Sequence, residues 1–145
     1  MSNPIGTQLA MADPKPAPPV ACTHQTPLKP GVPGSPGHLI RLPGRDPGIS
    51  QLAALMRRML EDLQKQKQVL ESPSAKPRKT VLPALIDFSQ ISCAWPTDQS
   101  TRTPVFNAYA IRMNEILAQH QEQQTRSTYT QVVDTCLACH QNYCR

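Results

Sequence analysis

The sequence predicts an all-α protein, an antiparallel four-helix bundle that follows a disordered Pro/Gly-rich N-terminal arm. The first observation behind this prediction is that residues 1–48 hold 11 of the 16 Pro and all 6 Gly of the 145-residue chain. The second is that apolar residues recur at intervals of three and four after residue 48, which is the spacing of amphipathic helices. Because β-sandwiches and phosphate-binding α/β folds need Gly in turns and near phosphate, the Gly-free stretch 49–145 excludes them.

The N-terminal part of the chain is predicted to be separate from the bundle. Residues 1–48 are predicted to be a disordered arm or linker, because Pro recurs there too often for a helix or a central strand and favours extended conformations. His24 and His38 lie in this arm, where nothing nearby would hold them as metal ligands. Residues 49–145 form the predicted bundle domain.

The first half of the bundle domain predicts two helices. From Ile49 to Ser72 one face is apolar and the others carry charged residues, which predicts an amphipathic helix that Pro73 ends. A shorter second helix is predicted over about Val81 to Cys93. Thr80 is its expected N-cap, with Pro83 in the first turn.

The second half of the bundle domain predicts two more helices. Thr103 and Pro104 are typical of an N-cap followed by Pro at the first helical position, and an apolar stripe continues to about Gln121. A fourth helix is predicted over about residues 124–143. Since most connections between the four helices are short, neighbouring helices are expected to be antiparallel.

One motif carries recognisable chemistry. Residues Cys136 to His140 read Cys-Leu-Ala-Cys-His, which is the C-x-x-C-H attachment sequence for c-type haem. On a helix, residues i and i+3 share a face, so the thiols of Cys136 and Cys139 can both add to the two vinyl groups at one edge of a porphyrin. The imidazole of His140 then offers an axial ligand to the iron. The sequence therefore predicts one covalently attached haem c.

Three other readings of these cysteines compete with haem attachment. A redox pair normally accompanies a βαβ context, which is absent from this sequence. A disulfide between i and i+3 on one helix is poorly placed. A zinc site from Cys136, Cys139, His140 and Cys144 stays open, although zinc ligands usually come from two separated pairs and these four crowd a single helix. Haem attachment is the favoured interpretation.

The C-terminal position of the motif and the number of helices give residues 49–145 a resemblance to a known family. The segment that ends in Tyr143, three residues after His140, resembles the end of cytochrome c′ and its Met-ligated relatives. The resemblance implies a haem-binding four-helix bundle, with Tyr143 at the cofactor, and such bundles often pair as homodimers. The chain departs from the family at Cys144, where the family usually has an Arg near the axial His; here Arg145 follows one residue later.

The resemblance also bears on the sixth iron ligand. Five-coordinate members present an apolar residue from the first helix and keep a pocket for small gases, whereas six-coordinate members present Met. Met56 is the first candidate, because the ligand of the relatives sits near the start of that helix, and Met59 is the second. Met on an apolar helix face is also a common core residue. Met113 is expected in the core, and His120 is expected to be solvated at a polar helix end.

The predicted function is that of a monohaem c-type cytochrome that exchanges single electrons with redox partner proteins. A five-coordinate haem protein that binds small gases such as NO or CO is the alternative, and a zinc-stabilised helical interaction module is a third reading. The sequence shows no paired carboxylates and no Ser-His-Asp order, so no enzyme activity is expected. Haem supplies the chemistry, and the protein sets its ligation, burial and access.

The net charge and the N-terminal sequence bear on the predicted partners and the predicted compartment. A net charge of +5 without a clustered Lys/Arg stripe predicts no nucleic-acid partner. The sequence contains no run of 18 apolar residues, so no transmembrane segment is predicted. Covalent haem attachment normally occurs outside the bacterial cytoplasm, which predicts the periplasm or cell envelope. The first 22 residues nevertheless show no recognisable signal peptide. Cys22, Cys93 and Cys144 have no partner evident from the sequence, and Cys93 is expected to be a small buried hydrophobe.

Overall fold

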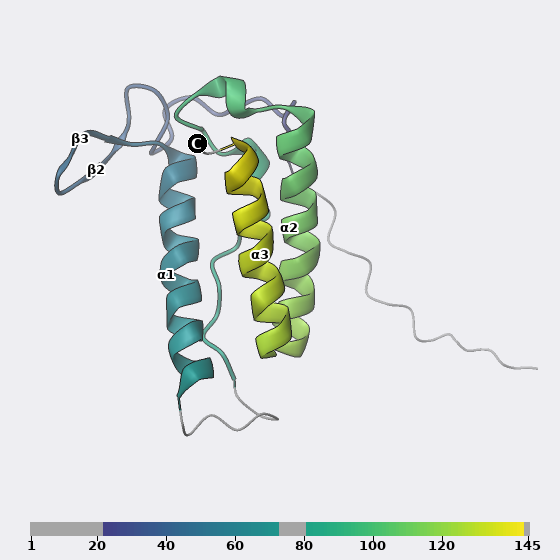
Figure 1. Cartoon of the computed structure of the whole chain (residues 1–145). Helices are drawn as coiled ribbons and strands as arrows, with labels where there is room; N and C mark the ends of the chain where they lie inside the picture. Colours follow the sequence, from purple (N-terminus) through teal and green to yellow (C-terminus); the bar gives the residue numbers. More distant parts are fainter. Residues whose placement is uncertain (1–21, 73–80, 144–145) are drawn as a thin grey trace, which may run out of the picture.

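The computed structural model describes residues 22–72 and 81–143, which contain three long helices and a small hairpin (Figure 1). The elements, in chain order, are strand β2 (Ile40–Leu42), strand β3 (Arg45–Ile49), helix α1 (Gln51–Glu71), the 3₁₀ turns η1 (Ile91–Cys93) and η2 (Gln99–Thr101), helix α2 (Pro104–Gln123) and helix α3 (Arg126–Tyr143). The prediction of an all-α four-helix bundle is therefore wrong: the described residues form three helices and a two-stranded antiparallel sheet.

The predicted second helix, over about residues 81–93, is not a helix. Residues 81–88 are extended, and only η1 at the end of the segment is helical. The backbone N–H of Leu82 donates to Oε1 of Gln124 at 2.9 Å, and that of Ile86 donates to Oδ2 of Asp62 at 2.8 Å. Asp62 on α1 thus takes the N–H of Ile86, a group that a helix would pair internally, and Gln124 takes that of Leu82. The predicted N-cap, Thr80, lies outside the described residues.

The three other predicted helices are present, with ends set by local capping. The Ser50 side chain accepts a hydrogen bond from the N–H of Ala53 and begins α1. The predicted N-cap Thr103 accepts from the N–H of Phe106, with Pro104 in the first turn of α2. Gln124 adopts a left-handed conformation, φ 51°, which ends α2 and turns the chain into α3.

The core lies between the three helices and the segment around η1. Its buried apolar side chains come from α1, from the segment before α2, from α2 itself and from α3; they are Leu52, Met59, Leu63, Phe88, Ile91, Ala94, Phe106, Ala110, Met113, Ile116, Leu117 and Val132. In Figure 1, α2 and α3 run side by side, and α1 stands on the other side of α3. No helix in the described part of the chain is both long and apolar enough to cross a membrane.

The described part of the predicted arm, residues 22–48, is ordered rather than disordered. Strands β2 and β3 pair antiparallel, and a disulfide joins Cys22 to Cys93 across 71 residues. Arg102 donates to the backbone carbonyls of Thr23 and Thr26, which holds the same stretch against the loop before α2.

Two glycines of the arm have packing roles rather than linker roles. Gly34 has φ +93°, and a Cβ there would overlap the backbone of Gln51 at the start of α1. Gly48 has φ +129°, and a Cβ there would meet the carbonyl oxygen of Ile40 in the opposite strand. A Gly-rich composition, which suggested disorder, here supplies turns and close backbone approaches.

Candidate functional site

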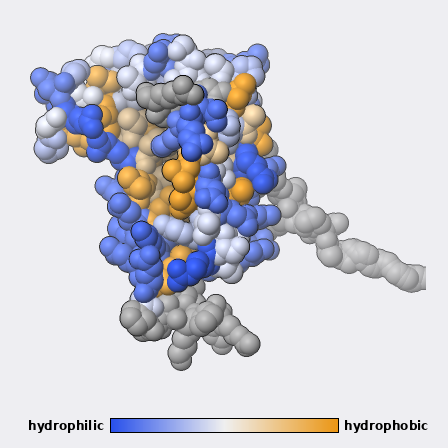
Figure 2. All heavy atoms as spheres, viewed as in Figure 1, coloured by the Kyte–Doolittle hydropathy of each residue, from blue (hydrophilic) through white to orange (hydrophobic). Residues whose placement is uncertain are grey.

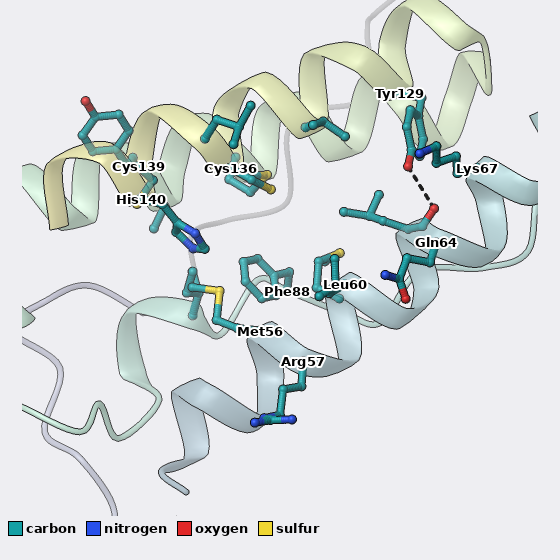
Figure 3. A pocket seen from close by; sticks show the side chains of 18 of the residues that line it. Met56, Arg57, Leu60, Gln64, Lys67, Phe88, Tyr129, Cys136, Cys139 and His140 are labelled. Carbon is teal, nitrogen blue, oxygen red and sulfur yellow. Dashed lines mark hydrogen bonds between the residues drawn. The ribbon is translucent and has the colours of Figure 1, made fainter. Parts of the chain in front are cut away.

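A cavity of about 550 Å³ lies between α1 and α3, with α2 and the segment before η1 behind it (Figure 3). Helix α1 contributes a wall that includes Met56, Met59 and Leu60, and α3 contributes the wall formed by its C-terminal half. The remaining lining residues are Phe88, Ile91, Phe106, Tyr109, Ala110 and Met113. Small-molecule and cofactor sites have volumes of about 300–1,000 Å³ and mostly apolar linings. The cavity resembles them in both its volume and its lining.

The α3 wall contains all three residues predicted to attach and ligate haem. Cys136, Cys139 and His140 line the cavity. Cys136 is half-buried, and Cys139 is buried at 9% exposure. His140 is exposed, at the mouth of the cavity. The helical spacing that the motif requires is thus realised in α3, and it brings both sulfurs and one imidazole to the same apolar space.

The two cysteine pairs of the described chain are in different chemical states. Cys22 and Cys93 form a disulfide, whereas Cys136 and Cys139 are thiols. Burial raises the pKa of the Cys136 thiol, which keeps it protonated. A redox-active cysteine needs the opposite shift, toward the thiolate, so this environment argues against the dithiol redox reading.

The α1 wall contains both predicted candidates for the sixth ligand. Figure 3 shows the side chain of Met56 pointing toward the ring of His140 from the opposite wall of the cavity. Met59 also lines the cavity but belongs to the core cluster, with 3% of its surface exposed. The structure therefore brings the first candidate opposite the imidazole of His140 and keeps the second in the packed interior.

The prediction that His120 is solvated is wrong. In the structure this residue is buried, with 1% of its surface exposed. Its Nε2 lies 2.7 Å from Oε1 of Gln66, and its Nδ1 lies 2.7 Å from Oγ1 of Thr128. The Gln66 amide nitrogen donates in turn to the carbonyl of Pro83 at 2.7 Å. Burial lowers the pKa of His120, so the neutral imidazole is favoured, and both of its nitrogens are engaged away from the cavity.

The other residues singled out from the sequence have separate positions. Met113 is in the core, as predicted. Cys22 and Cys93 are partners, which no local pattern indicated. Cys144, Arg145 and the side chain of Tyr143 lie outside the described residues, so the role of Tyr143 at the cofactor stays a prediction.

Sequence reasoning missed the cations at the edge of the cavity. Arg57 and Lys67 of α1 line it together with Leu60 and Gln64, although the sequence predicts that the charged residues of this helix lie on the faces away from the core. These four residues recur at intervals of three and four, so the helical period itself could have placed them on one stripe.

Among the described residues, no group of three or more His, Cys, Asp or Glu side chains is placed to hold a metal ion. A structural zinc site needs about four protein ligands. Haem iron needs only one or two from the protein, because the porphyrin supplies the rest. The described donors around this cavity are one imidazole, two thiols and the thioethers of Met56, Met59 and Met113. With the two thiols bound to a porphyrin, the imidazole and one thioether would be enough for haem iron.

Comparison with protein-family models, with curated proteins and with solved structures found no match to this chain.

Proposed function

We propose that the protein is a monohaem c-type cytochrome that carries single electrons. The observation that supports this most directly is that the C-x-x-C-H segment faces an apolar cavity of about 550 Å³ with Met56 on the opposite wall. The haem-attachment sequence and a cofactor-sized space are independent features, because a motif that arose by chance would have no reason to open onto a cavity.

Cys136 and Cys139 are the proposed attachment residues. Each thiol adds across one vinyl double bond: a carbon–sulfur bond forms, and the thiol proton goes to the other vinyl carbon, with no net oxidation. The raised pKa of Cys136 is compatible with this role, since a thioether removes an ionisable group from an apolar wall. Covalent attachment also retains the cofactor in a cavity that is open at its mouth.

His140 is the proposed axial ligand and Met56 the proposed sixth ligand, with Met59 as the second choice. The bound cofactor supplies one-electron redox chemistry at its iron. Met is a soft ligand that raises the reduction potential of haem iron relative to a second His. Phe88, Phe106 and Met113 behind the cavity exclude water from the cofactor and so contribute to the same tuning.

A location in the periplasm or cell envelope is part of this proposal. The Cys22–Cys93 disulfide supports it, because such bonds persist in oxidising compartments and are rare in the cytosol. Covalent haem attachment points to the same side of the bacterial membrane.

The decisive experiment is a pyridine haemochrome spectrum of the full chain produced in a host that exports it and attaches haem. We expect the absorption bands of c-type haem at one haem per chain, retained after extraction with acidified acetone. A colourless protein from that host would refute the proposal, and bound zinc in its place would support the interaction-module reading.

The coordination number separates the electron carrier from the gas-binding alternative. We expect the reduced wild-type protein to be low-spin and unchanged by carbon monoxide, because Met56 occupies the sixth position. Met56→Ala is expected to become high-spin and to bind carbon monoxide, whereas Met59→Ala is the matched control and keeps the low-spin spectrum. A wild-type protein that binds carbon monoxide at once would favour the gas-binding function.

A further inference from the structure

Two cations line the cavity. Arg57 and Lys67, both exposed, come from α1, and among the described residues no Asp or Glu lines it. In the part of the chain that the structure describes, the recorded ion pair joins Arg112 to Glu115 and involves neither of these cations. Ten residues separate Arg57 from Lys67, about 15 Å along a helix that rises 1.5 Å per residue, so the two residues lie near opposite ends of the stripe that α1 contributes to the cavity.

Between these cations the surface is apolar. Leu60 of α1 is 56% exposed and Leu137 of α3 is 54% exposed, and both line the cavity. Figure 2 shows an apolar strip on the face between α1 and α3, with hydrophilic side chains on both sides. Exposed leucines that meet at a cavity and are bordered by polar residues are typical of an interaction surface.

We propose that this surface, defined by Arg57, Leu60 and Lys67 of α1 and Leu137 of α3, docks an acidic electron-transfer protein. The inference rests on the proposed function, because it places the partner against the edge of the bound cofactor. One electron then passes from the reduced partner to the ferric iron, which becomes ferrous, and no bond is made or broken. Arg57 and Lys67 would complement carboxylates on the partner.

The size and chemistry of the surface suit a transient encounter. Redox complexes are small, below about 1,200 Å² of buried area, and two leucines between two cations provide an apolar centre with a charged border on that scale. Opposite charges steer such encounters and raise association rates by about 10 to 1,000-fold at low salt. The effect weakens as salt screens it.

The test compares two double variants of the haem-loaded full chain. Arg57→Glu with Lys67→Glu reverses the charges at the cavity, and Arg58→Glu with Lys65→Glu is the matched control. Arg58 and Lys65 are exposed on the same helix but do not line the cavity. Both variants replace one Arg and one Lys by Glu, so they change the net charge equally. The reaction measured by stopped flow is reduction of the ferric protein by a reduced, acidic plant-type [2Fe–2S] ferredoxin.

We expect the cavity-edge variant to lose at least tenfold in second-order rate constant at low ionic strength, against less than threefold for the control. The milder Arg57→Gln with Lys67→Gln should give an intermediate loss. With hexaammineruthenium(II), a small cationic donor, the Glu variant should react no more slowly than the wild type, which shows that its iron is still accessible.

Three results would overturn the docking surface. Equal losses in both Glu variants would mean that only net charge matters. Loss of haem content in the cavity-edge variants alone would mean that Arg57 and Lys67 hold the carboxylates of the cofactor. No loss in either variant would place the contact elsewhere. A wild-type protein without haem instead refutes the proposed function, a result that the haemochrome spectrum distinguishes from the other three.

Discussion

The two ends of the α1–α3 interface are built in opposite ways. At the end formed by the last turns of α1 and the first turns of α3, polar side chains join the helices directly. The hydroxyl of Tyr129 donates to the carbonyl of Leu63 at 3.0 Å, and Arg126 donates to the carbonyl of Leu70 at 2.6 Å. At the other end, the side chains of Met56, Cys136 and His140 face a cavity.

Two histidines show the same contrast. His120, at the bonded end, is buried, and both ring nitrogens have partners. His140, at the cavity end, is exposed at the mouth of an apolar space. The bonded end is complete with side chains alone, whereas the cavity end leaves a space of about 550 Å³ that the proposed haem would fill.

The largest expected effect is the loss of the proposed haem from the cavity end. Cys136→Ser together with Cys139→Ser should abolish covalently attached haem, because no sulfur remains to form a thioether. Acid-acetone extraction followed by a pyridine haemochrome assay measures what remains on the protein. The matched control, Cys22→Ser together with Cys93→Ser, should keep its haem. Extraction-resistant haem in the first variant would show that the C-x-x-C-H segment is not the attachment site.

The same control pair predicts a large effect on stability. Loss of the Cys22–Cys93 disulfide frees a loop of about 70 residues, and loops of that size correspond to about 4 kcal/mol in the free energy of unfolding. Urea denaturation of haem-free proteins, with and without the disulfide, measures the difference. An unchanged midpoint would mean that the N-terminal segment contributes nothing to the stability of either end.

A smaller effect tests the bonded end through His120. In His120→Ala the buried Oε1 of Gln66 loses its partner, at a cost of about 1–3 kcal/mol for a buried group left unpaired, whereas the Thr128 hydroxyl keeps its hydrogen bonds with Thr125. Urea denaturation of the haem-free variant at neutral pH measures the loss, and a cost below about 0.5 kcal/mol would mean that the polar cluster is not what closes this end.

The same histidine predicts a pH dependence with a definite sign. Burial lowers the pKa of folded His120 below its ordinary value of 6.5, so between the two values the unfolded chain binds more protons. The contribution of His120 to the free energy of unfolding is complete above pH 6.5 and is lost as the pH falls through the folded pKa. Wild-type stability should therefore fall on acidification below about pH 6.5, and His120→Ala should lack that component. Identical pH profiles would contradict the assignment.

The smallest expected effect is the loss of one hydrogen bond across the interface. Tyr129→Phe removes the bond to the Leu63 carbonyl, which contributes about 1 kcal/mol as a typical net value, and preserves the ring at the edge of the cavity. A shift in the urea midpoint of haem-free protein measures it. If the loss exceeded that of His120→Ala, Tyr129 rather than the His120 cluster would be the main link at this end.

Local signals predicted three helices with useful accuracy. Thr103 and Pro104 mark the start of α2 in the sequence and in the structure, because an N-cap and an N1 proline act within one turn of chain. The spacing of Met56 and Met59 placed both on the cavity side of α1, and the interval from Cys136 to His140 placed the residues of the C-x-x-C-H segment on one wall. Each of these features depends on residues at most four apart.

The errors share a cause, which is a partner far away in the sequence. Residues 81–88 are extended because Asp62 and Gln124 take their backbone N–H groups, from 24 and 42 residues away. Residues 22–48 pack on the helices because Cys22 pairs with a cysteine 71 residues later and Arg102 donates to the carbonyls of Thr23 and Thr26. A weak signal did exist for His120, since Gln66 stands at an inward position of an otherwise apolar stripe and needs a buried partner.

The sequence by itself determined the three long helices, their capping residues and a C-x-x-C-H segment whose members share one helical face. Only the tertiary structure decided that the second predicted helix is instead an extended segment, that residues 22–48 are joined to the rest by a disulfide at Cys22, and that one histidine is buried while the other lines a cavity. Helical period and capping are set by neighbours within a turn. Disulfide pairing, burial and cavity shape depend on which distant surfaces meet, and no local pattern encodes that choice.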